Sequence, residues 1–155
     1  MQAVLRFGGF VVEKAIYYRN SEFWSQEEIP ETADLEPIFR FAIVENPNDY
    51  HEANIVLGVQ IGEESSLIPF RVELVIRGYF QLDESVDKDL AKKMYAQNAI
   101  AILFPYLRSL VTDLTARSNH APILLPTLNI IKVAEQYFSK HDQTEFDTSF
   151  QSLTD

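Results

Sequence analysis

The 155-residue sequence contains no cysteine. This absence excludes a disulfide framework, a cysteine nucleophile and every metal site built on thiolates. It also favours a reducing compartment, and we expect the cytoplasm. Basic residues are scarce as well, because 13 Lys and Arg against 23 Asp and Glu give a formal net charge of −10. That charge repels a phosphate backbone, so the expected partners are proteins or small molecules and not nucleic acid.

Motifs of targeting and catalysis are also missing. The early apolar run at residues 7–12 is interrupted by two glycines and is too short for a signal peptide or a membrane span, so no membrane insertion is expected. His51, His120 and His141 are scattered without a metal-ligand spacing, and no Gly-x-Ser-x-Gly motif is present. No Lys-Ser or Lys-Thr follows the glycine pair, which argues against a phosphate loop. The sequence therefore predicts a protein that is not an enzyme and that has no metal and no cofactor.

The clearest positive pattern lies in residues 98–117. Apolar side chains recur there at the spacing of three and four that forms one stripe of an α-helix: Ile100, Leu103, Leu107, Leu110, Val111 and Leu114. Ile102, Phe104 and Tyr106 lie off that stripe, so we expect the helix to contact two partners. Pro105 predicts a kink or a restart of the helix, because proline lacks the backbone donor.

The rest of the chain predicts an α+β fold. Four segments rich in β-branched and aromatic residues precede the helix, at residues 4–18, 38–44, 50–61 and 70–82. Short turns between the last three, together with an expected bulge at Gly8-Gly9, predict a four-stranded antiparallel meander with two C-terminal helices packed on it. The second helix is expected over residues 131–138. We expect one domain over residues 1–139 and a flexible acidic tail over residues 140–155.

Two segments leave alternatives open. The acidic stretch 20–36 fits a solvated connection or a docking surface for a basic partner. The loop at residues 123–128 is unusually apolar, and it fits a buried return crossing or a mobile hydrophobic flap. Apolar residues are also expected on both faces of the sheet, which an oligomer, a binding groove or a curled sheet would explain: Phe39, Phe41, Ile43, Val56 and Val75.

Several segments resemble the SecB export-chaperone family. The strongest is the run Leu103–Arg108, which contains a Phe-Pro-Tyr-x-Arg motif, followed by Pro126–Asn129. Ile16-Tyr17 and the hairpin at residues 50–80 are similar as well, and the resemblance spans about residues 4–138. It implies a four-stranded antiparallel sheet with two helices, assembled as a homodimer or homotetramer. It also implies a protein that holds unfolded polypeptides and, in that family, passes them to the SecA motor.

The resemblance is incomplete at the positions that would meet SecA. In SecB-like chaperones acids near the end of the first strand contribute to that surface, whereas Asn20 and Trp24 occupy the matching positions here. Glu22 and Glu73 remain as candidates for partner docking, and a stable SecA complex is not expected. The chain is thus similar to divergent SecB-like proteins, which include small acidic proteins of Gram-positive bacteria and chaperones that protect antitoxins.

Two functions follow from the resemblance. The first is an ATP-independent chaperone that binds unfolded or partly folded polypeptides. The alternative is a SecB-fold module dedicated to one specific partner, for example an antitoxin-type client, without a general holdase or export role. A holdase requires a long adaptable apolar groove, whereas a dedicated binder requires a short pocket with defined polar contacts. The candidate client-binding residues are Phe39, Phe41, Ile43, Ile123, Leu124, Leu125 and Tyr137.

Overall fold

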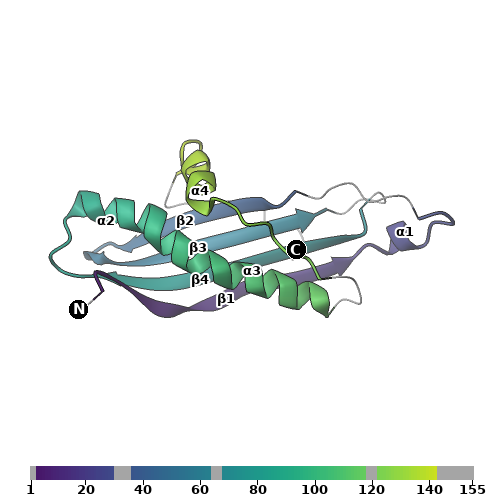
Figure 1. Cartoon of the computed structure of the whole chain (residues 1–155), viewed down its shortest axis with the longest axis horizontal. Coiled ribbons are helices and arrows are strands. Elements are labelled where there is room, and N and C mark those ends of the chain that lie inside the picture. The colour runs from purple at the N-terminus through teal and green to yellow at the C-terminus, as the bar shows by residue number, and fades with distance from the viewer. Residues whose placement is uncertain (1–2, 30–35, 64–67, 118–121, 143–155) are drawn as a thin grey trace.

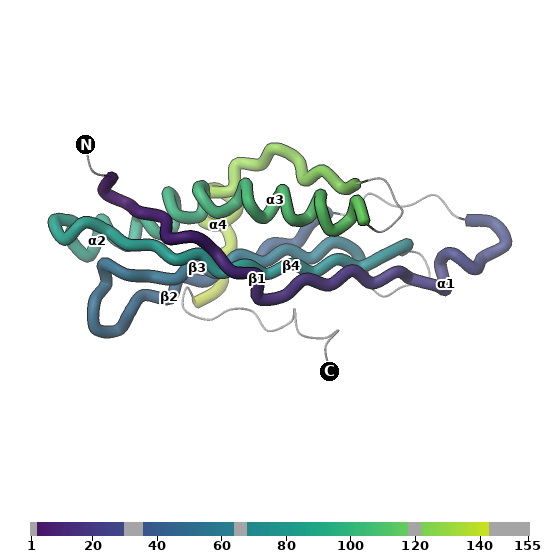
Figure 2. Tube along the Cα trace, turned by 90° about the horizontal axis from the view of Figure 1, so that it is seen from below, coloured from purple at the N-terminus to yellow at the C-terminus, as the bar shows by residue number. Residues whose placement is uncertain are grey.

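The computed structural model describes residues 3–29, 36–63, 68–117 and 122–142 (Figure 1). Its strands are β1 (Leu5–Arg19), β2 (Ile38–Asn46), β3 (Asp49–Gly62) and β4 (Phe70–Leu82). Its helices are α1 (Ser21–Trp24), α2 (Lys88–Met94), the π-helical turn η1 (Tyr95–Ala99), α3 (Ile100–Ala116) and α4 (Ile130–Phe138). Seen from the side, α2, α3 and α4 lie over one face of the sheet, and no described helix covers the other (Figure 2). We call these the helix side and the helix-free face.

The strand order is β1-β4-β3-β2, and every neighbouring pair is antiparallel. Strands β2, β3 and β4 form the predicted meander. The order expected for β1 was wrong, because β1 pairs with β4 at the far side of the sheet and not with β2. The connection between β1 and β2 is long, so the rule that neighbouring strands pair through short turns does not apply to it. As a result β1 and β2 are the two edge strands.

The core lies on the helix side and follows the alternation of β3. Its residues Ala53, Ile55, Leu57, Val59 and Ile61 are all buried. Register pairs them with apolar residues on both neighbouring strands, for example Leu57 with Phe41 of β2 and with Ile76 of β4. Successive residues of a strand point to opposite faces, so one register places the whole apolar set against the helices. The predicted alternation is confirmed.

The long helix is one continuous element from Lys88 to Ala116. Asp87 caps it, because its side chain accepts a hydrogen bond from the Leu90 amide at 2.8 Å. The apolar stripe predicted for residues 98–117 faces the sheet, and Leu103 is completely buried. No break occurs at Pro105, which is exposed and lies inside α3. The restart predicted as one possibility does not occur, and the irregular turn of the helix lies upstream at η1.

This helix is also long and apolar enough to cross a membrane, with a mean hydropathy of 1.3 over its best window. A core helix of a soluble protein satisfies the same test. Its apolar stripe packs closely on the sheet, and a Cβ atom added at Gly78 of β4 would lie 2.9 Å from a methyl group of Leu103. We therefore describe it as the core helix of this fold.

Two glycine positions shape the strands. The register of β1 against β4 shifts between Phe7 and Phe10, and Gly9 within that shift has a φ of 97°. The bulge predicted at Gly8-Gly9 is therefore confirmed. Gly62 ends β3 with a φ of 79°, and a Cβ atom there would lie 2.1 Å from the Phe70 carbonyl oxygen. Only glycine tolerates both constraints, so this residue sets the turn into the β3–β4 connection.

Candidate functional site

The edge strand β2 carries an aromatic surface on the helix side. The Phe39 ring contacts Phe104 of α3, with centroids 5.8 Å apart, and the Phe41 ring contacts Tyr137 of α4 at 5.4 Å. Phe138 also approaches Phe41, at 5.9 Å. These rings form the contact between β2, α3 and the short helix α4. An apolar strand at the sheet edge is thus covered by a helix of only nine residues.

The apolar segment before α4, residues 123–128, crosses α3 and is attached to it by hydrogen bonds. We call it the crossing segment. The Thr112 hydroxyl donates to the Ile123 carbonyl at 2.9 Å, and the Thr115 hydroxyl accepts from the Ile123 amide at 2.8 Å. The Arg108 guanidinium donates to the Leu125 carbonyl at 3.2 Å. Backbone groups that side chains satisfy in this way hold a segment in place without regular secondary structure. This geometry favours the return crossing over a flap for the part around Ile123 and Leu125.

An open groove of about 580 Å³ runs between α3 and this crossing segment. Pro105, Arg108 and Asp113 line its α3 side, while Leu124 and Leu125 line the other. Leu125 is buried, whereas Leu124 is 76% exposed. The groove therefore combines one protruding apolar side chain with charged groups of both signs.

Helix α4 begins at Asn129, whose side chain accepts a hydrogen bond from the Lys132 amide. Its buried residues are Ile130, Ala134 and Tyr137. At its end the Tyr137 ring stacks on His141, with centroids 4.0 Å apart, and a His141 ring nitrogen lies 2.9 Å from the Tyr137 carbonyl. One apolar stripe of α4 thus packs on β2 while its opposite side is polar, as expected for a surface helix.

The helix-free face has a different composition. Glu73 of β4 is completely buried there and forms ion pairs with Lys14 of β1 at 2.9 Å and with Arg71 at 2.8 Å. Nearby, the Arg77 guanidinium bonds Glu13 at 2.5 Å. Because a buried carboxylate is stable only with compensating charges, the two cations account for Glu73 in this position. Its oxygen atoms already face these cations, and Glu22 lies apart from them in α1.

The two positions that differ from the SecB pattern have structural roles here. Asn20 donates from its side chain to the Ile68 carbonyl at 2.9 Å and from its amide to the Pro69 carbonyl at 3.0 Å. The Trp24 indole donates to the same Pro69 carbonyl at 3.0 Å. Arg19 lies over the Trp24 ring, 5.4 Å from its centroid. Together they attach α1 to the start of β4.

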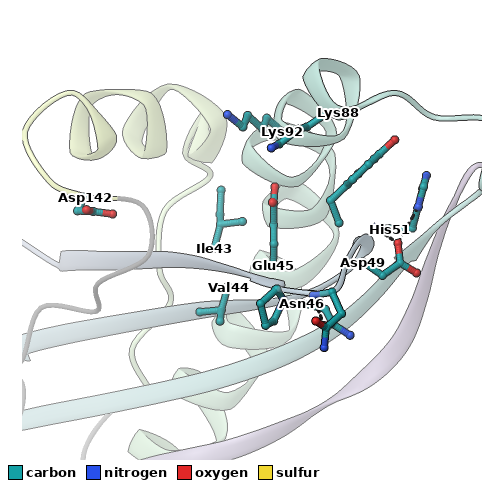
Figure 3. A pocket seen from close by; sticks show the side chains of 12 residues that line it. Ile43, Val44, Glu45, Asn46, Asp49, His51, Lys88, Lys92 and Asp142 are labelled. Carbon is teal, nitrogen blue, oxygen red and sulfur yellow. Dashed lines mark hydrogen bonds and ion pairs between the residues drawn. The ribbon is translucent and has the colours of Figure 1, made fainter.

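A second cavity, of about 700 Å³, lies at the turn between β2 and β3 (Figure 3). Lys88 and Lys92 of α2 lie above Glu45, with Asp49 and His51 to one side and Asp142 on the other. Cations and carboxylates both line it, so its charge favours neither anions nor cations. Among the described residues no group of three or more His, Asp or Glu could hold a metal ion.

His51 connects this turn to the loop before α2. One ring nitrogen lies 2.8 Å from an Asp49 carboxylate oxygen and the other 3.0 Å from the Val86 carbonyl, so both nitrogens face acceptors. This geometry fits the protonated imidazolium. The Asp49 carboxylate raises the pKa of His51, and the His51 backbone amide, followed by its ring, lowers the pKa of Asp49. Nearby, the Tyr50 hydroxyl also donates to Val86, while burial raises the pKa of Tyr95.

The structure brings the predicted client-binding residues together in part. Phe39, Phe41, Ile43 and Tyr137 meet between β2 and α4, where all are buried and belong to the core. They are packing residues: a client reaches Phe41 only if α4 moves, whereas Phe39 lies against Phe104 of α3. The residues 123–125 form a separate site over α3, and only Leu124 protrudes from it.

The cations of the helix-free face were not predicted from the sequence as a site. Lys14, Arg71 and Arg77 alternate with apolar residues in β1 and β4, and this alternation was visible as a pattern. Their meeting with Glu73 was not visible, because it depends on the pairing of β1 with β4. The tail predicted over residues 140–155 is described only to Asp142, so residues 143–155 lie outside the described part.

Comparison with known proteins finds two relatives by sequence. An uncharacterised protein of Methanocaldococcus jannaschii is 25% identical over 132 residues, which are 83% of this chain and 81% of that protein. The protein-export protein SecB of Anaplasma phagocytophilum is 25% identical over 112 residues, 67% of this chain and 71% of the relative.

A solved structure is similar as well. The SecB-like chaperone Rv1957 of Mycobacterium tuberculosis, in complex with a ChAD peptide from the HigA1 antitoxin, superposes with a TM-score of 0.62 at 15% identity. The match covers 80% of this chain and 90% of that one, and it shows a common fold. The family described as preprotein translocase subunit SecB matches residues 21–142. The chain belongs to the SecB family.

Proposed function

We propose that this SecB-family chain is an ATP-independent chaperone that binds extended apolar segments of unfolded polypeptides along β2, beneath α4. The observation that supports this most directly is the aromatic row of the edge strand, in which Phe41 lies under the nine-residue helix α4 and Phe39 lies next to it against Phe104 of α3. An edge strand offers unpaired backbone groups to an incoming strand, and its apolar side chains offer pockets for alternate residues.

The attachment of the crossing segment gives this proposal a mechanism. Thr112, Thr115 and Arg108 hold the chain at Ile123 and Leu125, ahead of α4. Displacement of α4 from β2 therefore leaves the crossing segment in place, and the segment acts as a pivot. This displacement exposes apolar side chains at a cost of about 1.5–3 kcal/mol for each large one, and a bound apolar client covers them again. No nucleotide is needed, because exchange of one apolar contact for another requires no energy input.

The alternative is a binder dedicated to one partner. The hydrogen bonds that attach the crossing segment to α3 support this possibility. They fix the shape of the groove, and a groove of fixed shape is more selective for one partner than an adaptable surface is. The antitoxin peptide bound by the Mycobacterium tuberculosis chaperone of the same fold supports it too. Under this alternative the groove with Leu124 recognises a short peptide.

An aggregation assay with several unrelated unfolded clients distinguishes the two. A general chaperone suppresses aggregation of all of them near stoichiometry, whereas a dedicated binder suppresses none and retains one tight partner in a pull-down. Leu124→Ser is the matched test, with Leu90→Ser on α2 as the control, because both side chains are exposed. If the chain is the dedicated binder, we expect Leu124→Ser to weaken binding of its partner and Leu90→Ser to leave it unchanged, whereas a general chaperone that binds clients along β2 should tolerate both changes. Equal effects would contradict a site at the crossing segment.

We further infer a homodimer or homotetramer in the cytoplasm. The free edge of β1 supports the oligomer, since Val11 and Val12 are exposed along a strand of 15 residues and exposed strand edges pair readily. Next to them in β1, the Phe10 ring contacts Tyr106 of α3, with centroids 5.1 Å apart and the rings tilted, and Tyr106 is itself exposed. The absence of cysteine supports the compartment. Light scattering tests the assembly, and a monomeric mass at micromolar concentration would contradict it.

A further inference from the structure

The groove between α3 and the crossing segment contains a guanidinium group that no described carboxylate neutralises. Arg108 is half-buried in the wall of this groove, and its side chain donates a hydrogen bond from Nη2 to the Leu125 carbonyl oxygen at 3.2 Å. Its Nε atom is buried and has no hydrogen-bond partner in the described part of the chain. A buried donor without an acceptor costs free energy, because it has lost its bond to water. Arg108 therefore retains unused donors for a ligand.

The other charged residue that lines the groove is Asp113. Neighbouring side chains on a helix lie three or four residues apart, and Asp113 is not at that spacing from Arg108. It forms its ion pair with Arg117 instead, at 3.5 Å, and both of these side chains are exposed. Among the residues that line the groove, the unpaired charge is therefore positive.

An apolar side chain lies beside this charge. Leu124 directly precedes Leu125, the residue whose carbonyl accepts the bond from Arg108, and its side chain protrudes from the surface. Pro105 and Ala116 add small apolar surfaces on the α3 side of the groove. The groove thus offers a guanidinium and an apolar contact close together. A ligand that uses both must carry a carboxylate and an apolar side chain on the same side.

An extended peptide meets this requirement with a simple spacing. Alternate residues of an extended chain point to the same side and lie about 7 Å apart. A carboxylate can accept two N–H bonds from one guanidinium, which fixes its position better than a point charge does. Because the groove is open, it suits the side chain of a chain that continues past Arg108 more than a chain terminus. The chemistry of the groove therefore points to a segment in which an acidic residue alternates with an aliphatic one.

We propose that Arg108 binds the side-chain carboxylate of a peptide partner, and that the groove selects extended segments in which Asp or Glu alternates with aliphatic residues. This inference rests on the second function proposed above, a binder dedicated to one partner, and it states the chemistry of that partner. Client binding along β2 does not depend on it. The net charge of −10 repels acidic ligands from the surface as a whole, so a preference for an acidic segment must arise locally.

Two peptides that differ at one position test the proposal. The probe is acetyl-Ser-Leu-Thr-Glu-Thr-Leu-Ser-amide, in which the Glu and both Leu side chains lie on the same side of an extended chain. Its counterpart has Gln in place of Glu. Blocked ends leave the Glu side chain as the only carboxylate, so a chain terminus cannot produce the result. Affinities are measured by NMR titration of the isotope-labelled full chain, which also follows the Arg108 Nε–H signal.

We expect the Glu peptide to bind about fivefold more tightly than the Gln peptide, which corresponds to about 1 kcal/mol for a partly exposed ion pair. Arg108→Gln should abolish this preference. Arg6→Gln removes an exposed arginine from β1, outside the groove, and should leave the preference unchanged. Leu124→Ser should weaken binding of both peptides equally and keep their ratio. High salt should reduce the preference, because it screens exposed charges.

A second readout separates recognition from structure. The bond from Arg108 to Leu125 helps to hold the crossing segment, so Arg108→Gln also removes a structural contact. Loss of that contact alone would weaken binding of both peptides by the same factor and would not change their ratio. In the wild type, where the contact is intact, we expect the Glu peptide to shift the Arg108 Nε–H signal and the Gln peptide to leave it in place. This comparison decides the question even where the variant does not fold, and equal shifts would contradict the inference.

Results of the titration can also overturn the inference. Equal affinities of the two peptides, or a preference that Arg108→Gln leaves unchanged, would show that Arg108 does not bind the carboxylate. If Leu124→Ser still weakens binding of both peptides in that case, the groove remains the site of a dedicated binder and only the role of Arg108 is wrong. Binding of neither peptide would exclude the groove as a site for acidic segments, whereas the aggregation assay with unfolded clients tests the chaperone function separately.

Discussion

The two faces of the sheet are built from alternate residues of the same strands, yet different forces stabilise them. The helix side places residues such as Leu57 and Ile76 under Leu103, and its contacts are almost entirely apolar. The helix-free face places Glu73 between Lys14 and Arg71 beside a small apolar cluster. Apolar burial is insensitive to pH and to moderate salt, whereas ion pairs depend on both. The helix side therefore supplies the bulk of stability, and the helix-free face supplies a surface that conditions can change.

The strongest test of this contrast replaces a core residue of the helix side. Phe41→Glu places an unpaired carboxylate where the side chain is completely buried, and we expect a loss of more than about 4 kcal/mol of the free energy of unfolding. Urea denaturation followed by circular dichroism measures it. The matched control is Leu124→Glu, which should remain folded because Leu124 is exposed. A folded Phe41→Glu variant with the wild-type midpoint would show that β2 is not packed beneath α4.

The next test addresses the buried ion pairs of the helix-free face. Glu73→Ala leaves Lys14 and Arg71 without their carboxylate, and breaking a buried pair costs about 3–5 kcal/mol. Glu13→Ala removes the partner of Arg77, where both side chains are partly exposed, and should cost only about 0–1 kcal/mol. Urea midpoints of the two variants provide the comparison. Similar losses would mean that Glu73 is as solvated as Glu13.

A smaller effect is expected from pH at the β2–β3 turn. The pKa of His51 is raised in the folded state. Its contribution to the free energy of unfolding is therefore complete below the ordinary pKa of 6.5, and it is lost as the pH rises through the folded-state pKa. The pKa of Asp49 is lowered, so its contribution is present above the ordinary 3.8 and is lost as the pH falls through the folded value. Both contributions are therefore present between these two ordinary values.

The variant that isolates this pair is His51→Gln. Glu45, Lys88 and Lys92 face the same cavity and are present in both proteins, so the difference between the two melting temperatures reports the pair of His51 and Asp49. We expect the melting temperature of the wild type to fall from about pH 6 to pH 9 relative to that of His51→Gln. Parallel curves would contradict an imidazolium at His51.

The smallest expected effect concerns SecA. Glu73 is buried against two cations, and Glu22 lies on the surface of α1, so no fixed acidic surface formed by these two residues faces a basic peptide. Exposed pairs contribute about 0–1 kcal/mol each, and we expect no stable complex in calorimetry with a SecA C-terminal peptide at physiological salt. A submicromolar affinity that Glu73→Lys abolishes would show that the helix-free face binds this motor.

The sequence by itself determined the elements and the family. The spacing of apolar residues from Ile100 to Leu114 specified the core helix, and the alternation of β3 specified its buried face, because both patterns follow from backbone geometry alone. The glycine pair specified the bulge of β1. The Phe-Pro-Tyr-x-Arg run at residues 104–108 identified the SecB resemblance, which the match over residues 21–142 confirms.

Only the tertiary structure decided what the residues of each face do. The position of β1 beside β4 depends on pairing across a long connection, which no local pattern encodes, and it is this pairing that brings Lys14 to Glu73. For the same reason Glu73 was predicted as a docking residue and lies in a buried ion pair. Phe39 and Phe41 carry the same apolar signal whether a helix or a client covers them, since hydrophobicity has no direction. Phe39 is buried against α3 and Phe41 beneath α4, and both positions depend on contacts between segments that are far apart in the sequence.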